Sequence, residues 1–178
     1  MIFYKMDLSS VENCARINES DEVRFLEDIM DIQNYDALKI ENQLCFPLYA
    51  ASRSIIRRYK PFLDELDLTY TQYLAMMVLW QEKAMTVKEL GNMLYLDSGT
   101  LTPLLKKLEA KGLITRKRSE EDERNLIITI TAEGEQLREQ AVGIPAKMAQ
   151  VWNLKEEEAA LLYQILYKIL RSDIAQTE

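Results

Sequence analysis

Two cysteines, Cys14 and Cys45, are the side chains of this 178-residue chain best suited to nucleophilic or redox chemistry. The chain contains no histidine, which excludes Ser-His hydrolytic triads, Cys-His dyads and zinc sites that use histidine. Two thiols are too few for a disulfide framework or a four-thiolate metal site. We therefore expect no metal and no other cofactor.

Cys45 is the better placed of the two cysteines. It lies between Leu44 and Phe46, where a helix is predicted to begin, and Pro47 supports this start because proline fits the first turn of a helix. Unpaired N–H groups at a helix start carry partial positive charge and favour the thiolate, which reacts with a peroxide to give a sulfenic acid. The alternative is a cysteine that packs as a small hydrophobic residue.

Positive charge is concentrated in one stretch of a chain whose formal net charge is -7. Residues 1–36 carry nine acidic and three basic side chains, whereas residues 98–118 carry six basic side chains and one acidic side chain, Glu109. This local excess indicates a phosphate-binding face that the whole-chain average hides. A solvated helix face is the alternative interpretation of the lysines.

Hydrophobic spacing predicts the first two helices. Apolar residues at three- and four-residue steps predict a helix over 41–59, which Pro61 would end. A capping box of Thr69 and Gln72 opens the next helix. Its segment 74–80 is apolar on all sides, so we expect full burial of this segment.

A compact helical pair and a hairpin follow. A capping box of Thr86 and Glu89 opens a short helix to about residue 94, and the next helix runs over 98–111, with Gly112 as its C-terminal cap. The apolar period then changes to two, which predicts a hairpin of two strands, 113–118 and 126–130.

The C-terminal third is predicted to be helical. Thr131 caps a long helix that Gly143 and Pro145 interrupt, and a last helix carries a wide apolar stripe. The stripe consists of Leu161, Leu162, Ile165, Leu166, Ile169 and Leu170.

The resulting fold class is mainly α with a small β-hairpin, in the order of a winged helix-turn-helix with N- and C-terminal dimerisation helices. We assign residues 71–131 to the winged helix-turn-helix and residues 38–62 and 132–174 to dimerisation helices, within one domain of residues 37–178. Residues 1–36 are either a poorly packed acidic extension or an artefact of an early translation start. A second copy of the chain would cover the apolar stripes, because half-sites of palindromic DNA require a symmetric dimer.

Four segments together resemble the MarR superfamily, specifically its organic hydroperoxide-sensing repressors of the OhrR type. These segments are ENQLCF (41–46), LDLTYTQY (66–73), LYLDSGTLTPLL (94–105) and KRSEEDER (117–124). The resemblance implies a homodimeric, cytoplasmic, non-enzymatic repressor that binds a palindromic double-stranded DNA operator and releases it when organic hydroperoxide oxidises Cys45. It also implies that Tyr59 and Tyr70 of the other subunit hold the reduced and oxidised sulfur.

The resemblance further implies behaviour of the one-cysteine kind. Two-cysteine members carry a resolving thiol in the C-terminal half, and this chain has no cysteine after Cys45. A cellular low-molecular-weight thiol would then form the mixed disulfide. Cys14 would be the resolving thiol only if the extension folds back over the first helix.

The DNA-contacting residues are expected on the second helix of the pair and on the hairpin. Short side chains and first-turn N–H groups let that helix approach base edges and phosphates, and basic side chains would contact the backbone. These residues are Ser98, Gly99, Thr100, Thr102, Pro103, Lys106, Lys107, Arg116 and Arg118. The resemblance places Arg124 in the minor groove with Asp122 steadying it; a surface ion pair without a DNA role is the alternative.

Two other functions remain open at this point. A MarR-type repressor released by a phenolic or drug-like ligand would not need Cys45 for its response. A thiol peroxidase would turn over peroxide but would leave the helix-turn-helix unexplained. No apolar run approaches the ~20 residues that span a bilayer, so we expect no membrane association.

Overall fold

The computed structural model describes residues 35–120, 122, 124–152 and 154–174. The chain divides into two compact units, Met1–Arg57 and Arg58–Glu178. Cys14 and all but the last two residues of the acidic extension lie outside the described residues. Among the helices in the described part, none is long and apolar enough to span a membrane.

The first unit contains two short 3-10 helices, η2 (Tyr35–Leu38) and η3 (Ile40–Asn42), and the start of helix α2 (Cys45–Asp64). Helix α2 begins at Cys45, which the sequence placed at or near the helix start, so residues 41–44 of the predicted span 41–59 lie before the helix. It continues through Pro61, so the prediction that this proline ends the helix is wrong. The residues after Pro61 enter the core, with Leu63 buried, and this burial offsets the loss of one N–H donor.

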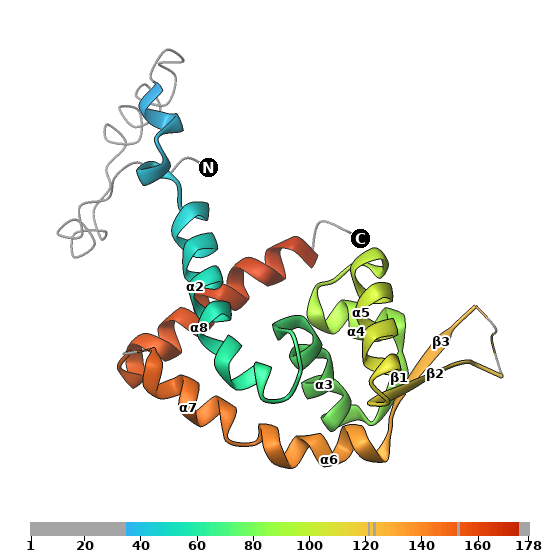
Figure 1. Ribbon diagram of the computed structural model, residues 1–178. Coiled ribbons are helices and arrows are strands. Elements are labelled where there is room, and N and C mark those ends of the chain that lie inside the picture. Colours follow the sequence, from blue (N-terminus) through green and yellow to red (C-terminus); the bar gives the residue numbers. More distant parts are fainter. Residues whose placement is uncertain (1–34, 121, 123, 153, 175–178) are drawn as a thin grey trace. The chain divides into compact units, whose positions relative to one another are not determined.

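The second unit contains the rest of the elements, which Figure 1 shows in colours that follow the chain. They are α3 (Tyr70–Glu82), β1 (Ala84–Thr86), α4 (Val87–Leu94), α5 (Ser98–Ala110), β2 (Ile114–Arg118), β3 (Leu126–Ile130), α6 (Ala132–Ala141), α7 (Ile144–Val151) and α8 (Glu156–Ile174). The predicted interruption of the long helix is confirmed, because α6 ends before Gly143 and α7 carries Pro145 in its first turn.

Capping side chains define the helix boundaries as the sequence predicted. The Thr69 hydroxyl accepts the Gln72 N–H at 3.3 Å, and the Gln72 side chain accepts the Thr69 N–H at 2.9 Å. Thr86 and Glu89 form the same reciprocal pair at the start of α4. Gly112 ends α5 with φ of 73°, a conformation that residues with a Cβ atom rarely adopt.

The sheet has three antiparallel strands in the order β1-β3-β2. The predicted hairpin corresponds to β2 and β3, with Arg116 paired with Ile128. Strand β1 was not predicted; Met85, at its centre, also pairs with Ile128. A three-residue strand is too short to show alternation, and its pairing depends on a partner more than 40 residues away.

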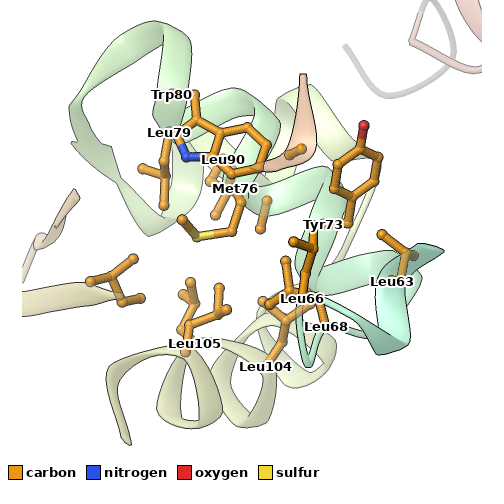
Figure 2. Close-up of a cluster of buried hydrophobic side chains, with 14 of the residues drawn as sticks. Leu63, Leu66, Leu68, Tyr73, Met76, Leu79, Trp80, Leu90, Leu104 and Leu105 are labelled. Atoms are coloured by element: carbon orange, nitrogen blue, oxygen red, sulfur yellow. The ribbon is translucent and has the colours of Figure 1, made fainter. Parts of the chain in front are cut away.

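The core of the second unit packs α3 against α5 and the sheet (Figure 2). Four leucines of α5 at helical spacing supply one side: Leu101, Leu104, Leu105 and Leu108. Tyr73, Met76, Leu79 and Trp80 of α3 supply the other. Met77 is 43% exposed, so the prediction that segment 74–80 is fully buried is wrong at this position. One side of α3 points away from the core that α5 and the sheet complete.

Candidate functional site

Cys45 is an exposed, free cysteine and the first residue of α2. The Phe46 N–H donates to the Gln43 carbonyl at 3.3 Å, and the Leu48 N–H donates to the Leu44 carbonyl at 3.5 Å. The expectation of unpaired donors beside the sulfur is therefore wrong for these two amides, because the turn before the helix already uses them. The exposure of Cys45 leaves it accessible to a small molecule.

The two predicted tyrosines contact each other in the second unit. The Tyr59 ring of α2 and the Tyr70 ring of α3 have centroids 5.0 Å apart, and Tyr73 lies 6.0 Å from Tyr59. Burial raises the pKa of all three hydroxyls above the usual tyrosine value. At neutral pH each hydroxyl therefore keeps its proton and can donate a hydrogen bond. Tyr73, for which no function was predicted, is the third ring of this group.

The exposed face of α5 carries the residues predicted to contact DNA. Its leucines are buried, while every predicted contact on the helix is exposed. These exposed residues are Ser98, Gly99, Thr100, Thr102, Pro103, Lys106 and Lys107. The Thr102 hydroxyl donates to the Ser98 carbonyl at 2.7 Å, so this hydroxyl is oriented to accept from an outside donor. The face combines small side chains with two lysines one turn further along the helix.

Asp97 caps α5, a role that was not predicted from the sequence. Its carboxylate accepts the Thr100 N–H at 2.8 Å and the Thr100 hydroxyl at 3.1 Å. These hydrogen bonds hold the pKa of Asp97 below its ordinary value. The signal was present in the sequence, because aspartate directly before a helix is a preferred N-cap. The cap occupies the first-turn amide that would otherwise be free for a phosphate.

Arg124 lies near the end of the hairpin, beside Asp122. The guanidinium donates to the Asp122 carboxylate at 2.9 Å and 3.1 Å, and the Arg124 N–H donates to the same carboxylate at 3.1 Å. These hydrogen bonds lower the pKa of Asp122 and raise that of Arg124. The Arg124 side chain is nevertheless 90% exposed. Asp122 thus orients an arginine that remains open to a partner.

The two other predicted arginines of the hairpin differ in their surroundings. Arg116 is bound to Glu109 of α5, with Nη2 2.5 Å and Nε 3.0 Å from the same carboxylate oxygen, and its side chain is only 17% exposed. The pair ties β2 to α5 and lowers the pKa of Glu109. Arg118 is exposed at the end of β2. Arg116 is therefore better placed to position the hairpin than to reach a distant phosphate.

Comparison with known proteins finds similarity to transcriptional regulators. Residues 57–140 match the family described as "Transcriptional regulator SarA/Rot". The chain is 51% identical over 138 residues to the organic hydroperoxide resistance transcriptional regulator of Bacillus subtilis, covering 78% of this chain and 94% of that protein. It is 44% identical over 121 residues to the regulator SarZ of Staphylococcus aureus, covering 68% and 82%.

A solved structure agrees with these relatives. The chain is similar to the structure of reduced AbfR bound to DNA; AbfR is a protein of Staphylococcus epidermidis. The TM-score is 0.65 and the sequence identity 36%, and the match covers 77% of this chain and 97% of the AbfR chain. The winged helix-turn-helix is thus supported by the arrangement of its elements and by relatives at high coverage. This chain belongs to the MarR superfamily of winged-helix transcriptional regulators, in the group of the organic hydroperoxide resistance regulators.

Proposed function

We propose that the chain is a homodimeric repressor that binds a palindromic operator while Cys45 is reduced and releases it when an organic hydroperoxide oxidises Cys45. The observation that carries the proposal is the exposed, free Cys45 at the first residue of α2. The similarity to a regulator named for organic hydroperoxide resistance supports the choice of oxidant.

The chemistry requires one thiolate and one peroxide. The Cys45 sulfur attacks the terminal oxygen of R–O–O–H, the one that bears hydrogen, so that an S–O bond forms and the O–O bond breaks. The leaving alkoxide takes a proton and becomes the alcohol, while the sulfur is oxidised to a sulfenic acid. A low-molecular-weight thiol then displaces hydroxide from the sulfenic sulfur, which gives a mixed disulfide and water. These steps do not require the Cys14 thiol as a resolving group.

Tyr59 and Tyr70 are assigned to the sulfur of the partner subunit. Their hydroxyls stay protonated at neutral pH because burial raises their pKa, so they can donate to a thiolate. Oxidation changes the size and the acceptor geometry of the group that they would contact. A change at one subunit would then alter the orientation of the other, and with it the spacing of the two recognition helices on DNA.

A second copy is the proposed occupant of the apolar face of α8. Its exposed residues recur at three- and four-residue steps along one stripe, as a helix interface requires. They include Leu161, Leu162, Ile165, Leu166 and Ile169. The two-fold symmetry of a dimer would match a palindromic operator.

A gel-shift titration tests the switch. Reduced protein is bound to the DNA upstream of its own gene, with and without one equivalent of cumene hydroperoxide. We expect the peroxide to release wild type and Cys14→Ser, and to leave Cys45→Ser bound. Retention of all three proteins would reject the peroxide switch, whereas release of Cys45→Ser would reject Cys45 as its sensor.

Peroxide stoichiometry separates a sensor from a thiol peroxidase. We expect one equivalent of hydroperoxide to be consumed for each chain when no reducing thiol is present. Continued consumption in the presence of excess thiol, at a rate comparable to that of dedicated peroxidases, would favour the enzyme.

A pocket of about 380 Å³ favours the ligand-released repressor as a second candidate. It lies between α3 and the α6–α7 segment, and Tyr73, Met77, Trp80 and Arg138 are among the residues that line it. Aromatic and thioether side chains beside a guanidinium suit a phenolic or carboxylate ligand. Release of Cys45→Ser from DNA by salicylate, together with loss of this response in Arg138→Gln, would support this candidate over the peroxide switch.

A further inference from the structure

Helix α2 carries an arginine on the face that bears Cys45. Cys45, Tyr49 and Arg53 follow one another at steps of four residues, so they lie along one face of the helix. All three are exposed and belong to the first unit. Because a helix rises about 1.5 Å per residue, the Arg53 backbone lies about 12 Å along the axis from that of Cys45.

The Arg53 side chain is folded back toward the start of the helix. Its Nη1 donates to the Tyr49 hydroxyl at 2.9 Å, and its guanidinium carbon lies 5.6 Å from the centroid of the Tyr49 ring. Side chains of a helix lean toward its N-terminus, which is the direction of Cys45. The contacts with Tyr49 therefore hold the guanidinium about one turn nearer to Cys45 than the Arg53 backbone is.

The positive charge of Arg53 is not neutralised within the described part of the chain. None of the ion pairs there includes Arg53, and the Tyr49 hydroxyl that accepts its hydrogen bond is neutral. Residues 45–57 contain two arginines, Arg53 and Arg57, and no carboxylate side chain. The guanidinium of Arg53 is therefore available to an anion that arrives at Cys45.

The second step of the proposed switch brings such a ligand to Cys45. The sulfur of a low-molecular-weight thiol forms an S–S bond with the sulfenic sulfur of Cys45 while the S–O bond breaks, and the hydroxide takes the thiol proton and leaves as water. An alkyl hydroperoxide is uncharged and gains nothing from a cation at this distance. A thiol with a carboxylate a few bonds from its sulfur would bring that carboxylate toward the guanidinium.

We propose that Arg53, oriented by Tyr49, binds the carboxylate of the incoming thiol, so that oxidised Cys45 selects anionic low-molecular-weight thiols for its mixed disulfide. A planar guanidinium suits a carboxylate because it can donate two parallel hydrogen bonds. The inference rests on the proposed function, since it concerns the step that follows oxidation of Cys45. It makes Arg53 a residue that determines which thiol reacts.

A matched pair of thiols tests this selection. N-acetylcysteine carries a carboxylate, and N-acetylcysteine amide carries a neutral amide in its place. Each protein is oxidised with one equivalent of cumene hydroperoxide and mixed with one of the thiols, and mass spectrometry follows the mixed disulfide in time. The two thiols differ in intrinsic reactivity, so the ratio of their rates is compared between wild type and each variant.

We expect the rate ratio of N-acetylcysteine to its amide to fall roughly two- to fivefold in Arg53→Gln, the size expected for an exposed ion pair. Arg53→Lys keeps the charge and should keep part of the preference. Arg57→Gln is the matched control, because it removes the same charge from an exposed position of the same helix one turn further from Cys45. An unchanged ratio in Arg53→Gln, or an equal fall in Arg57→Gln, would overturn the inference.

The salt dependence of the wild-type ratio tests the same contact without any variant. The ratio should fall as salt rises, because salt screens the attraction between the guanidinium and the carboxylate. Repulsion by the net charge of -7 would by itself give the opposite trend. A ratio that stays constant or rises with salt would therefore contradict the inference even if a variant folds poorly.

Trapping with dimedone before any thiol is added reports the peroxide step separately. Wild type that forms no dimedone adduct at Cys45 would reject the proposed function. An adduct at Cys45 together with no preference for the anionic thiol would reject only the role of Arg53.

Discussion

Tyr59 and Tyr70 have half-buried rings, and the Tyr59 ring also lies beside the buried ring of Tyr73. Their raised pKa values keep them protonated throughout the physiological range, so they act as hydrogen-bond donors without titrating. If the hydroxyls of Tyr59 and Tyr70 contact the sulfur, removing a hydroxyl while keeping its ring should change the oxidation of Cys45.

Tyr70→Phe removes this hydroxyl and keeps the ring packing. We expect slower oxidation of Cys45 and slower release of DNA, while the free energy of unfolding changes by only about 1 kcal/mol or less. The loss of free thiol after mixing with hydroperoxide, followed in time, measures the first effect. Tyr73→Phe is the matched control, because its ring is 2% exposed and belongs to the core. Equal rates for wild type and Tyr70→Phe would remove Tyr70 from the site.

Among the elements, α5 depends on its N-terminal cap. The Thr100 N–H and hydroxyl hold the pKa of Asp97 below its ordinary value. Because the folded-state pKa is lower than the unfolded one, the stabilisation from the ionised cap is fully present above about pH 4. It is lost as the pH falls from there through the folded-state pKa.

Asp97→Asn keeps an acceptor oxygen but cannot titrate in this range. We expect the stability advantage of wild type over the variant to shrink as the pH falls below about 4. Urea unfolding across these pH values measures the difference in free energy of unfolding between the two proteins. The contributions of the other carboxylates are common to both proteins and cancel in this difference. A difference that stays constant with pH would show that ionisation of Asp97 does not contribute.

The start of α6 is packed closely against the turn after α5. A Cβ atom at Gly134 would lie within van der Waals overlap of the Leu113 carbonyl oxygen and 2.9 Å from the Ile130 side chain. The Gly134 carbonyl also accepts the buried Trp80 indole N–H at 2.8 Å. Gly134 therefore lies where α6 approaches α3 and the sheet closely, and the lack of a side chain permits this approach.

Gly134→Ala should destabilise the protein by roughly 1–3 kcal/mol or more, since backbone must move to admit the methyl group. Gly143→Ala is the control, because nothing lies within 4 Å of a Cβ atom there and φ is -81°. It should be neutral or slightly stabilising. Thermal unfolding of the two variants makes the comparison, and equal melting temperatures would contradict the close packing.

At the scale of the whole molecule, the apolar face of α8 is the surface proposed for dimerisation. Its apolar stripe is exposed in the single chain, and burial of each large aliphatic side chain against a second copy would contribute about 1.5–3 kcal/mol. An exposed apolar stripe of this kind is expected at a subunit interface.

Ile165→Asp places a charge at the centre of this stripe in both subunits. We expect it to weaken dimerisation by at least tenfold and to weaken operator binding with it, since a monomer contacts only one half-site. Analytical ultracentrifugation measures the first effect and gel shift the second. Glu157→Gln, in the first turn of the same helix, is the control. If Ile165→Asp dimerises with unchanged affinity, the dimer interface does not include this face of α8.

Local signals in the sequence determined most of the helices and the hairpin. The Thr69 and Thr86 capping boxes, the left-handed Gly112 and the cap at Thr131 depend on residues within four positions of each other. Such interactions are encoded in short stretches of chain, and the structure confirms all four. The start of α2 was predicted less closely: the hydrophobic spacing began at residue 41, and the helix begins at Cys45.

Tertiary structure alone decided the features that depend on distant partners. Strand β1 forms because β3 pairs with it, and α2 continues past Pro61 because its last turn enters the core. Arg116 is tied to Glu109 on another element, and Tyr59 meets Tyr70 only after α2 and α3 pack. No short window of sequence contains both partners of these contacts, so their energies appear only when the chain is folded.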